Sequence, residues 1–177
     1  PSPLKAALLA EKSGAQGITI HLREDRRHIQ DSDVKAIQKA IRTKLNLEMA
    51  PTREMVDLAL ETRPYQVSLV PEKRQEITTE GGLDVCSQEN ELSLIRERMQ
   101  GGGILFSLFI DPDLAQVDAS QRIGADSVEF NTGKYTELET PEEIEAELER
   151  LKIAAKRAAE KGLRVFAGHG LNYDNVK

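Results

Sequence analysis

The feature that most constrains the fold is a repeated alternation of short apolar runs with helix-like segments. Runs typical of β-strands cover residues 17–22, 45–50, 66–70, 103–110, 127–130 and 164–167. Segments typical of helices cover residues 4–12, 52–62 and 141–161, and further helices begin near residues 31 and 111. Strands and helices in alternation predict an α/β domain with a parallel sheet and helices on its faces.

Local signals support the helix boundaries. The motif Asp31-Ser32-Asp33 is a typical helix start, and it is followed by apolar residues at the helical spacing of Val34, Ile37 and Ile41. The first and last helices are followed by Gly14 and Gly162 respectively, residues that commonly end helices.

Two architectures fit this alternation, an open doubly wound sheet and a closed (β/α)8 TIM barrel. A doubly wound nucleotide-binding domain carries G-x-G-x-x-G at its first strand–helix turn. The glycine runs here are Gly81-Gly82 and Gly101-Gly102-Gly103, and the second run precedes a strand instead of opening a helix. The barrel is therefore favoured, and it predicts that reactive residues gather where the strands end.

Composition excludes several classes of function. The net charge of −6 and the pI of about 5.2 argue against extensive nucleic-acid binding. No apolar run approaches the roughly 20 residues of a membrane-spanning helix. The single cysteine, Cys86, excludes an internal disulfide and suits the reducing cytoplasm. Neither CxxC nor HExxH occurs, so the sequence predicts no structural zinc site.

Polar residues follow the predicted strands. The first strand leads into His21, Arg23 and His28, within the charged stretch GITIHLREDRRH. Glu48 and Glu129 lie inside otherwise apolar strands. The sixth strand ends in Gly168-His169-Gly170. In a barrel these strand ends meet around one pocket.

The residue types at this pocket indicate acid–base chemistry on a small phosphorylated molecule. Arginine forks bind phosphate oxygens, and histidine titrates near neutral pH. A partly desolvated Glu48 should have a raised pKa and could act as a base. The alternatives are a structural role for each histidine, an arginine partner for Glu48, and a solvated, internally paired REDRR loop. Lys73 could form a Schiff base, although a solvated lysine fits its charged segment better.

The segments HLREDRRHIQDSDV, NLEMA, LVPEKRQEITTEGGLDV, SLFIDPD and AGHGLNYDNVK closely resemble the pyridoxine 5′-phosphate synthase family of vitamin B6 biosynthesis. The resemblance covers essentially the whole chain in the same order. It implies a (β/α)8 barrel that condenses 3-amino-2-oxopropyl phosphate with 1-deoxy-D-xylulose 5-phosphate. The products would be pyridoxine 5′-phosphate, inorganic phosphate and water.

The resemblance also implies roles for catalytic residues. His21 and Glu48 correspond to proton acceptors, His169 to a proton donor, and Glu129 to a residue that stabilises charged intermediates. One substrate supplies the amine for the imine. The resemblance therefore implies neither a bound cofactor nor a metal, and no catalytic lysine.

Substrate-binding residues follow from the same motifs. Arg23, His28 and Thr78 correspond to ligands of deoxyxylulose phosphate, and Gly170 to part of the aminoacetone-phosphate site. The family further suggests a homo-octamer. Asn131 stands where many members would carry a histidine, so no role is assigned to it.

Length is the main departure from the family. We expect residues 1–177 to form a single barrel domain with about six of the eight strands, truncated at both ends. Two other functions fit the residues. A metal-dependent sugar-phosphate aldolase or epimerase would use His21, Glu48 and His169 as ligands, and elemental analysis would identify its ion. An inactive barrel fragment or binding module would bind no substrate.

Overall fold

The computed structural model describes residues 2–72 and 81–176, and it confirms the predicted alternation of strands and helices. The strands are β1 (Gly17–His21), β2 (Lys44–Met49), β3 (Gln66–Leu69), β4 (Leu105–Ile110), β5 (Ser127–Asn131) and β6 (Arg164–Gly168). The helices are α1 (Pro3–Lys12), α2 (Asp31–Ala40), α3 (Arg53–Thr62), α4 (Glu89–Gly101), α5 (Leu114–Arg122), α6 (Gly133–Glu137) and α7 (Pro141–Glu160). A 3₁₀ turn, η1 (Cys86–Gln88), precedes α4.

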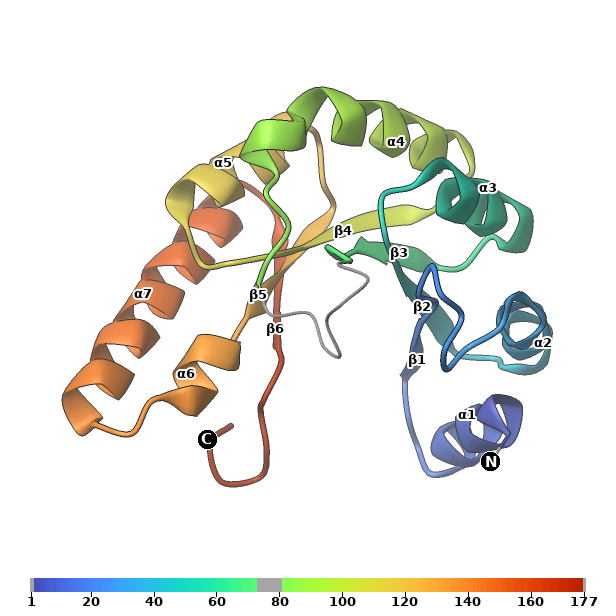
Figure 1. Ribbon diagram of the computed structural model, residues 1–177, viewed down its shortest axis with the longest axis horizontal. Helices are drawn as coiled ribbons and strands as arrows, with labels where there is room; N and C mark the ends of the chain where they lie inside the picture. The colour runs from blue at the N-terminus through green and yellow to red at the C-terminus, as the bar shows by residue number, and fades with distance from the viewer. Residues whose placement is uncertain (1, 73–80, 177) are drawn as a thin grey trace.

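The strand order identifies the architecture. Each strand pairs in parallel with its neighbour in sequence, giving the order β1-β2-β3-β4-β5-β6. A doubly wound sheet reverses its order at a switch point, whereas a (β/α)8 barrel adds its strands in sequence. The sheet curves, and helices cover its outer side (Figure 1). The predicted α/β barrel fold is therefore confirmed, as an arc of six strands within the described residues.

Two helices and the start of the fourth strand are the main differences from the sequence prediction, and other boundaries shift by one to three residues. Helices α4 and α6 were not predicted from the sequence, and the fourth strand begins at Leu105 instead of the predicted residue 103. Gly103 has φ of +71°, a left-handed conformation that does not fit a strand, so the strand begins after it. The pattern for α4 was present, because its buried face has the helical spacing of Leu92, Ile95 and Met99.

The hydrophobic core lies between the sheet and the helices. In β2, Leu45, Leu47 and Met49 are buried, while the residues between them are partly exposed. Helix α2 packs Val34 and Ile37 into the same core. Burial of each such side chain contributes roughly 1.5–3 kcal/mol. The alternation leaves the other face of each strand for the inside of the arc.

The inside of the arc is polar. The Ser68 hydroxyl donates to Asn46 Oδ1 at 2.9 Å, and Gln66 Nε2 donates to the same oxygen at 3.3 Å. Branched apolar side chains usually fill the inside of a barrel. Here hydrogen bonds between neighbouring strands link the inward-facing residues instead.

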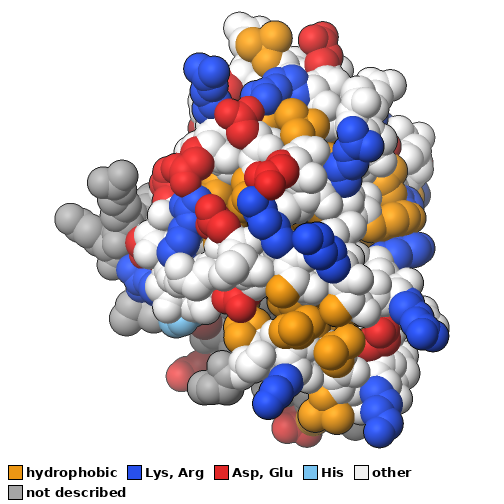
Figure 2. Space-filling view, turned by 90° about the vertical axis from the view of Figure 1, so that its right-hand side faces the viewer, with side chains coloured by type: hydrophobic (Ala, Val, Ile, Leu, Met, Phe, Trp, Pro, Cys, Tyr) orange, Lys and Arg blue, Asp and Glu red, His pale blue; other side chains and the backbone are white. Residues whose placement is uncertain are grey.

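The outer face carries paired charges. Figure 2 shows Lys and Arg side chains interspersed with Asp and Glu, with hydrophobic side chains gathered in the lower part of the view. Lys35 Nζ, for example, lies 2.6 Å from Glu61 Oε1. Exposed pairs of this kind add little stability. None of the helices within the described residues is long and apolar enough to cross a membrane.

Candidate active site

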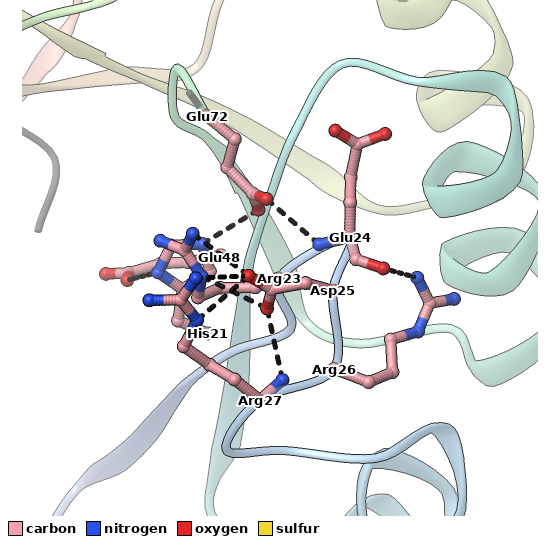
Figure 3. Close-up of polar contacts among 8 residues, drawn as sticks. All are labelled: His21, Arg23, Glu24, Asp25, Arg26, Arg27, Glu48 and Glu72. Carbon is pink, nitrogen blue, oxygen red and sulfur yellow. Dashed lines mark hydrogen bonds and ion pairs between the residues drawn. The ribbon is translucent and has the colours of Figure 1, made fainter. Parts of the chain in front are cut away.

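The arginine-rich loop after β1 is built on internal ion pairs. Asp25 accepts from Arg23 Nε at 3.3 Å and from Arg27 Nε at 2.8 Å (Figure 3). The hydrogen bond from Arg23, supported by Arg27, holds the pKa of Asp25 well below its usual range. Arg26, in a left-handed conformation with φ of +52°, pairs with Asp31 and Glu54. The loop therefore holds its arginines in fixed positions beside the end of β1.

His21 ends β1 between two carboxylates. Its Nε2 lies 3.1 Å from Glu72 Oε1, and its Nδ1 lies 3.8 Å from Glu48 Oε2. Register explains one contact, because His21 is paired with Glu48 across the β1–β2 ladder. The second contact comes from the segment after β3, on the next strand of the arc. Burial lowers the His21 pKa, and the hydrogen bond between His21 and Glu72 opposes this effect.

Glu48 and Glu129 are the in-strand carboxylates predicted from the sequence, and both face the inside of the arc. Burial raises the pKa of Glu48 to about 7, and the negative charge of Glu129 adds to this effect. Burial also raises the pKa of Glu129. Because a carboxyl group with a pKa near 7 exchanges protons readily at neutral pH, Glu48 is suited to acid–base work.

His169 follows β6 in a left-handed conformation with φ of +84°. Its ring packs on Phe109 of β4, with 4.5 Å between the ring centroids. The Thr132 hydroxyl lies 2.6 Å from the carbonyl oxygens of both Gly168 and His169, which fixes the turn. Burial lowers the His169 pKa, and the charge of His21 lowers it further, so the two histidines are electrostatic neighbours.

The structure thus brings together the predicted catalytic residues His21, Glu48, Glu129 and His169 at one end of the sheet. The predicted binding residues are placed less uniformly. Arg23 is buried in the loop after β1, whereas His28 is exposed farther along it. Gly170, with φ of +70°, approaches α6 so closely that a Cβ would lie 2.0 Å from Thr136 Oγ1. Thr78 and Lys73 lie outside the described residues.

A cavity of about 760 Å³ opens beside this end of the sheet. His169 and Gly170 line it together with residues from the ends of β4 and β5 and from α6 and α7. Asn131, to which the sequence assigned no role, lines this cavity and donates from Nδ2 to Asp111 Oδ1 at 3.0 Å. No group of three His, Cys, Asp or Glu side chains in the described ranges is arranged to hold a metal ion.

Sequence reasoning missed Glu72. Its side chain is only 4% exposed and contacts His21, but the surrounding PEKRQE segment is typical of a solvated loop. A signal was available, since Glu72 follows β3 at the strand end where the other site residues were sought.

Comparison with known proteins identifies the family. The model of the pyridoxal phosphate biosynthesis protein PdxJ matches residues 1–177. The chain is 54% identical to the pyridoxine 5′-phosphate synthase of a Synechococcus strain, over 99% of this chain and 74% of that protein. The corresponding enzyme of Aquifex pyrophilus is also 54% identical, over 100% of this chain and 76% of its own. The chain belongs to the PdxJ family of pyridoxine 5′-phosphate synthases.

Solved structures with low sequence identity support the fold. A phosphoribosylanthranilate isomerase from Thermotoga maritima aligns with a TM-score of 0.60 and 13% identity, over 99% of this chain and 75% of that one. A 4-hydroxy-2-oxoglutarate aldolase aligns with the same TM-score and identity, over 99% and 70%. The resemblance inferred from the motifs is thus confirmed at the level of family and fold. The PdxJ match spans every predicted site residue, including Thr78.

Proposed function

We propose that this chain carries the active site for condensing 3-amino-2-oxopropyl phosphate with 1-deoxy-D-xylulose 5-phosphate to pyridoxine 5′-phosphate. Membership of the PdxJ family supports this reaction. The observation that carries the proposal is the convergence of His21, Glu48, Glu129 and His169, four groups that can move or stabilise protons. Ring closure requires repeated proton transfers, and general acids and bases accelerate each by about 10²–10⁴-fold.

The local environments suit different roles. Glu48 and His21 are the proton acceptors, since at neutral pH both spend part of their time without a proton. His169 is the donor, the role that its correspondence to the family motif implies, and the lowered pKa makes its imidazolium a stronger acid. Glu129 stabilises positive charge that develops on the substrate amine. The amine comes from the substrate itself, so the proposal needs no cofactor and no Schiff-base lysine.

Phosphate recognition is assigned to the ends of the site. Arg23, His28 and Thr78 bind deoxyxylulose phosphate, and Gly170 contributes to the site for 3-amino-2-oxopropyl phosphate. The Arg23 guanidinium has the planar donor geometry that suits phosphate oxygens. At Gly170 the absence of a side chain lets the backbone approach its neighbours closely. We propose that the family's homo-octamer is the assembled form.

The test is a condensation assay with both phosphorylated substrates and mass-spectrometric detection of pyridoxine 5′-phosphate. We expect His21→Ala and Glu48→Gln each to lower kcat by about 10²-fold or more. Glu97→Gln, an exposed substitution on the outer helix α4, is the matched control and should leave kcat unchanged. Unchanged product formation in both site variants would contradict the proposal.

A further inference from the structure

Glu72 is a buried carboxylate with no role in the function proposed above. It lies just after β3, and its side chain is 4% exposed. Both carboxylate oxygens are engaged. Oε1 lies 3.1 Å from His21 Nε2, and Oε2 accepts the backbone N–H of Glu24 at 2.9 Å (Figure 3). A buried carboxylate with two donors points to a specific structural task, because burying it without partners would be costly.

We propose that Glu72 is a positioning residue that accepts the Nε2–H of His21 and directs the unprotonated Nδ1 toward Glu48 and the substrate. This inference rests on the proposed function in one respect, the role of His21 as a base. The residue acts through His21, and no contact between Glu72 and substrate is required.

The hydrogen-bonding capacities of the two partners support this tautomer. An ionised carboxylate only accepts, so the proton between Glu72 and His21 belongs to Nε2. A neutral imidazole carries one N–H, which leaves the lone pair on Nδ1. That nitrogen faces Glu48 Oε2 at 3.8 Å. His21 is therefore held with its basic atom toward the carboxyl group that shares its task.

Electrostatics give Glu72 a second effect. When His21 takes a proton, the imidazolium stays hydrogen-bonded to a negative charge, which offsets part of the penalty of burial. The other charged or titratable groups that face His21 come from β2, from the turn after β6 and from its own loop; they are Glu48, His169, Arg23 and Asp25. The 3.1 Å hydrogen bond between His21 and Glu72 is shorter than the 3.8 Å separation of His21 from Glu48.

The Glu24 contact ties the same carboxylate to the arginine-rich loop. Glu24 directly follows Arg23, so its amide fixes the chain at the point where β1 gives way to the loop. The Glu72 side chain thereby holds both His21 and the start of the arginine-rich loop. Loss of the carboxylate would loosen both.

The experiment uses 15N-labelled protein and long-range 1H–15N correlation spectra of the imidazole rings, recorded across a pH titration. The chain has three histidines, so His21→Ala identifies the His21 signals. We expect neutral His21 to be the Nε2–H tautomer. In Glu72→Gln, we expect His21 to titrate at lower pH and kcat to fall by about tenfold or more, with a smaller change in KM. Glu97→Gln should behave as wild type.

Two results would overturn the inference. One is a neutral His21 protonated at Nδ1 in the wild type. The other is a folded Glu72→Gln protein, with a wild-type melting curve, in which both the His21 titration and kcat are unchanged. If Glu72→Gln is unchanged while His21→Ala is inactive, the inference fails and the proposed function stands. If His21→Ala retains full activity, the proposed role of His21 fails regardless of the tautomer.

Discussion

At the scale of single residues, Glu48 lowers the stability of the fold at neutral and alkaline pH, because it is a carboxyl group buried in the candidate active site. Its neighbours Leu47 and Met49 are buried in the core, and it faces inward beside His21, within the electrostatic influence of Glu129. The ionised form is disfavoured there, so the pKa is raised to about 7. A carboxyl group whose pKa is raised in the folded state makes its most favourable contribution to stability at low pH, below its ordinary pKa. That stability is lost as the pH rises toward 7.

Replacing Glu48 with glutamine should therefore stabilise the fold at alkaline pH. Each pKa unit corresponds to about 1.4 kcal/mol, so Glu48→Gln should raise the free energy of unfolding by about 3 kcal/mol at pH 8.5. At pH 5 the gain should be less than about 1 kcal/mol, because the folded carboxyl is then protonated and the pH lies only slightly above the ordinary pKa of 4.5 that the unfolded carboxyl has. Urea unfolding at the two pH values measures the difference. A gain independent of pH would contradict the electrostatic explanation, and Glu97→Gln should show none.

The residues that were predictable share one property. Glu48 and Glu129 stand out as charges inside apolar strands, and His169 as a titratable residue at a strand end. Glu72 lacks that contrast, because charged residues surround it along the chain and its partner, His21, comes from another strand. Pairwise contacts such as these depend on register and curvature, which residue patterns do not specify.

At the scale of elements, the pairing of β5 with β6 places the Glu129 carboxylate against Gly168. An added Cβ at Gly168 would lie 2.2 Å from Glu129 Oε1 and 3.3 Å from its Cδ. The side chain can move more easily than the backbone. A larger residue at this position should thus displace the carboxylate while the strand stays in place.

Gly168→Ala should accordingly impair activity more than stability. We expect kcat to fall by about tenfold or more, with the free energy of unfolding lowered by about 1–3 kcal/mol at most. Gly101→Ala is the matched control, because nothing lies within 4 Å of its added Cβ at the end of α4. Condensation kinetics and urea unfolding of both variants measure the effect. Equal kcat in the two variants would show that Glu129 tolerates the methyl group.

Strand positions were predictable from apolar runs, whereas helix α4 was not located. Its sequence, ENELSLIRERMQG, carries the helical spacing of Leu92, Ile95 and Met99, but the charged and polar residues between them make this pattern less conspicuous than an apolar run. The boundary of β4 depended on Gly103, whose left-handed φ cannot be distinguished in the sequence from an ordinary strand start. Backbone conformation at such glycines follows from the packing of both neighbouring elements.

At the scale of the whole molecule, burial is uneven across the sheet. Every residue of β4 except Leu105 is buried, whereas Arg164, Phe166 and Ala167 of β6 are exposed. Within the described residues β6 pairs only with β5, and β4 lies between β3 and β5. Local opening should therefore require less free energy at β6 than at β4.

Hydrogen exchange of this 177-residue chain should follow that gradient. We expect amides in β6 to exchange at least about 100-fold faster than amides in β4, since local opening free energies range from near zero up to the global value. Mass spectrometry of peptic peptides from the two strands measures the rates. Equal protection of β4 and β6 would show that the sheet opens only as one unit.

The overall architecture was the most predictable level. Alternation of strands and helices, together with the absence of a fitting G-x-G-x-x-G, favoured the barrel, and the strand order confirmed it. Motifs in HLREDRRH and AGHG predicted the family. A pocket at the strand ends was predicted, whereas its lining by Asn131 and by residues of α6 and α7 was not, because that lining depends on which side chains meet across elements.

Residues on the two faces of a strand such as β2 are constrained by different requirements, one face by packing of the core and the other by the chemistry inside the arc. In β2, alternate residues either pack into the hydrophobic core under the helices or face the inside of the arc, as Asn46 and Glu48 do. A substitution at Leu47 changes the packing of the hydrophobic core, whereas one at Asn46 changes the inside of the arc with little effect on that core. Evolution can therefore vary the chemistry of such a strand in steps of two residues while the fold stays under a separate constraint.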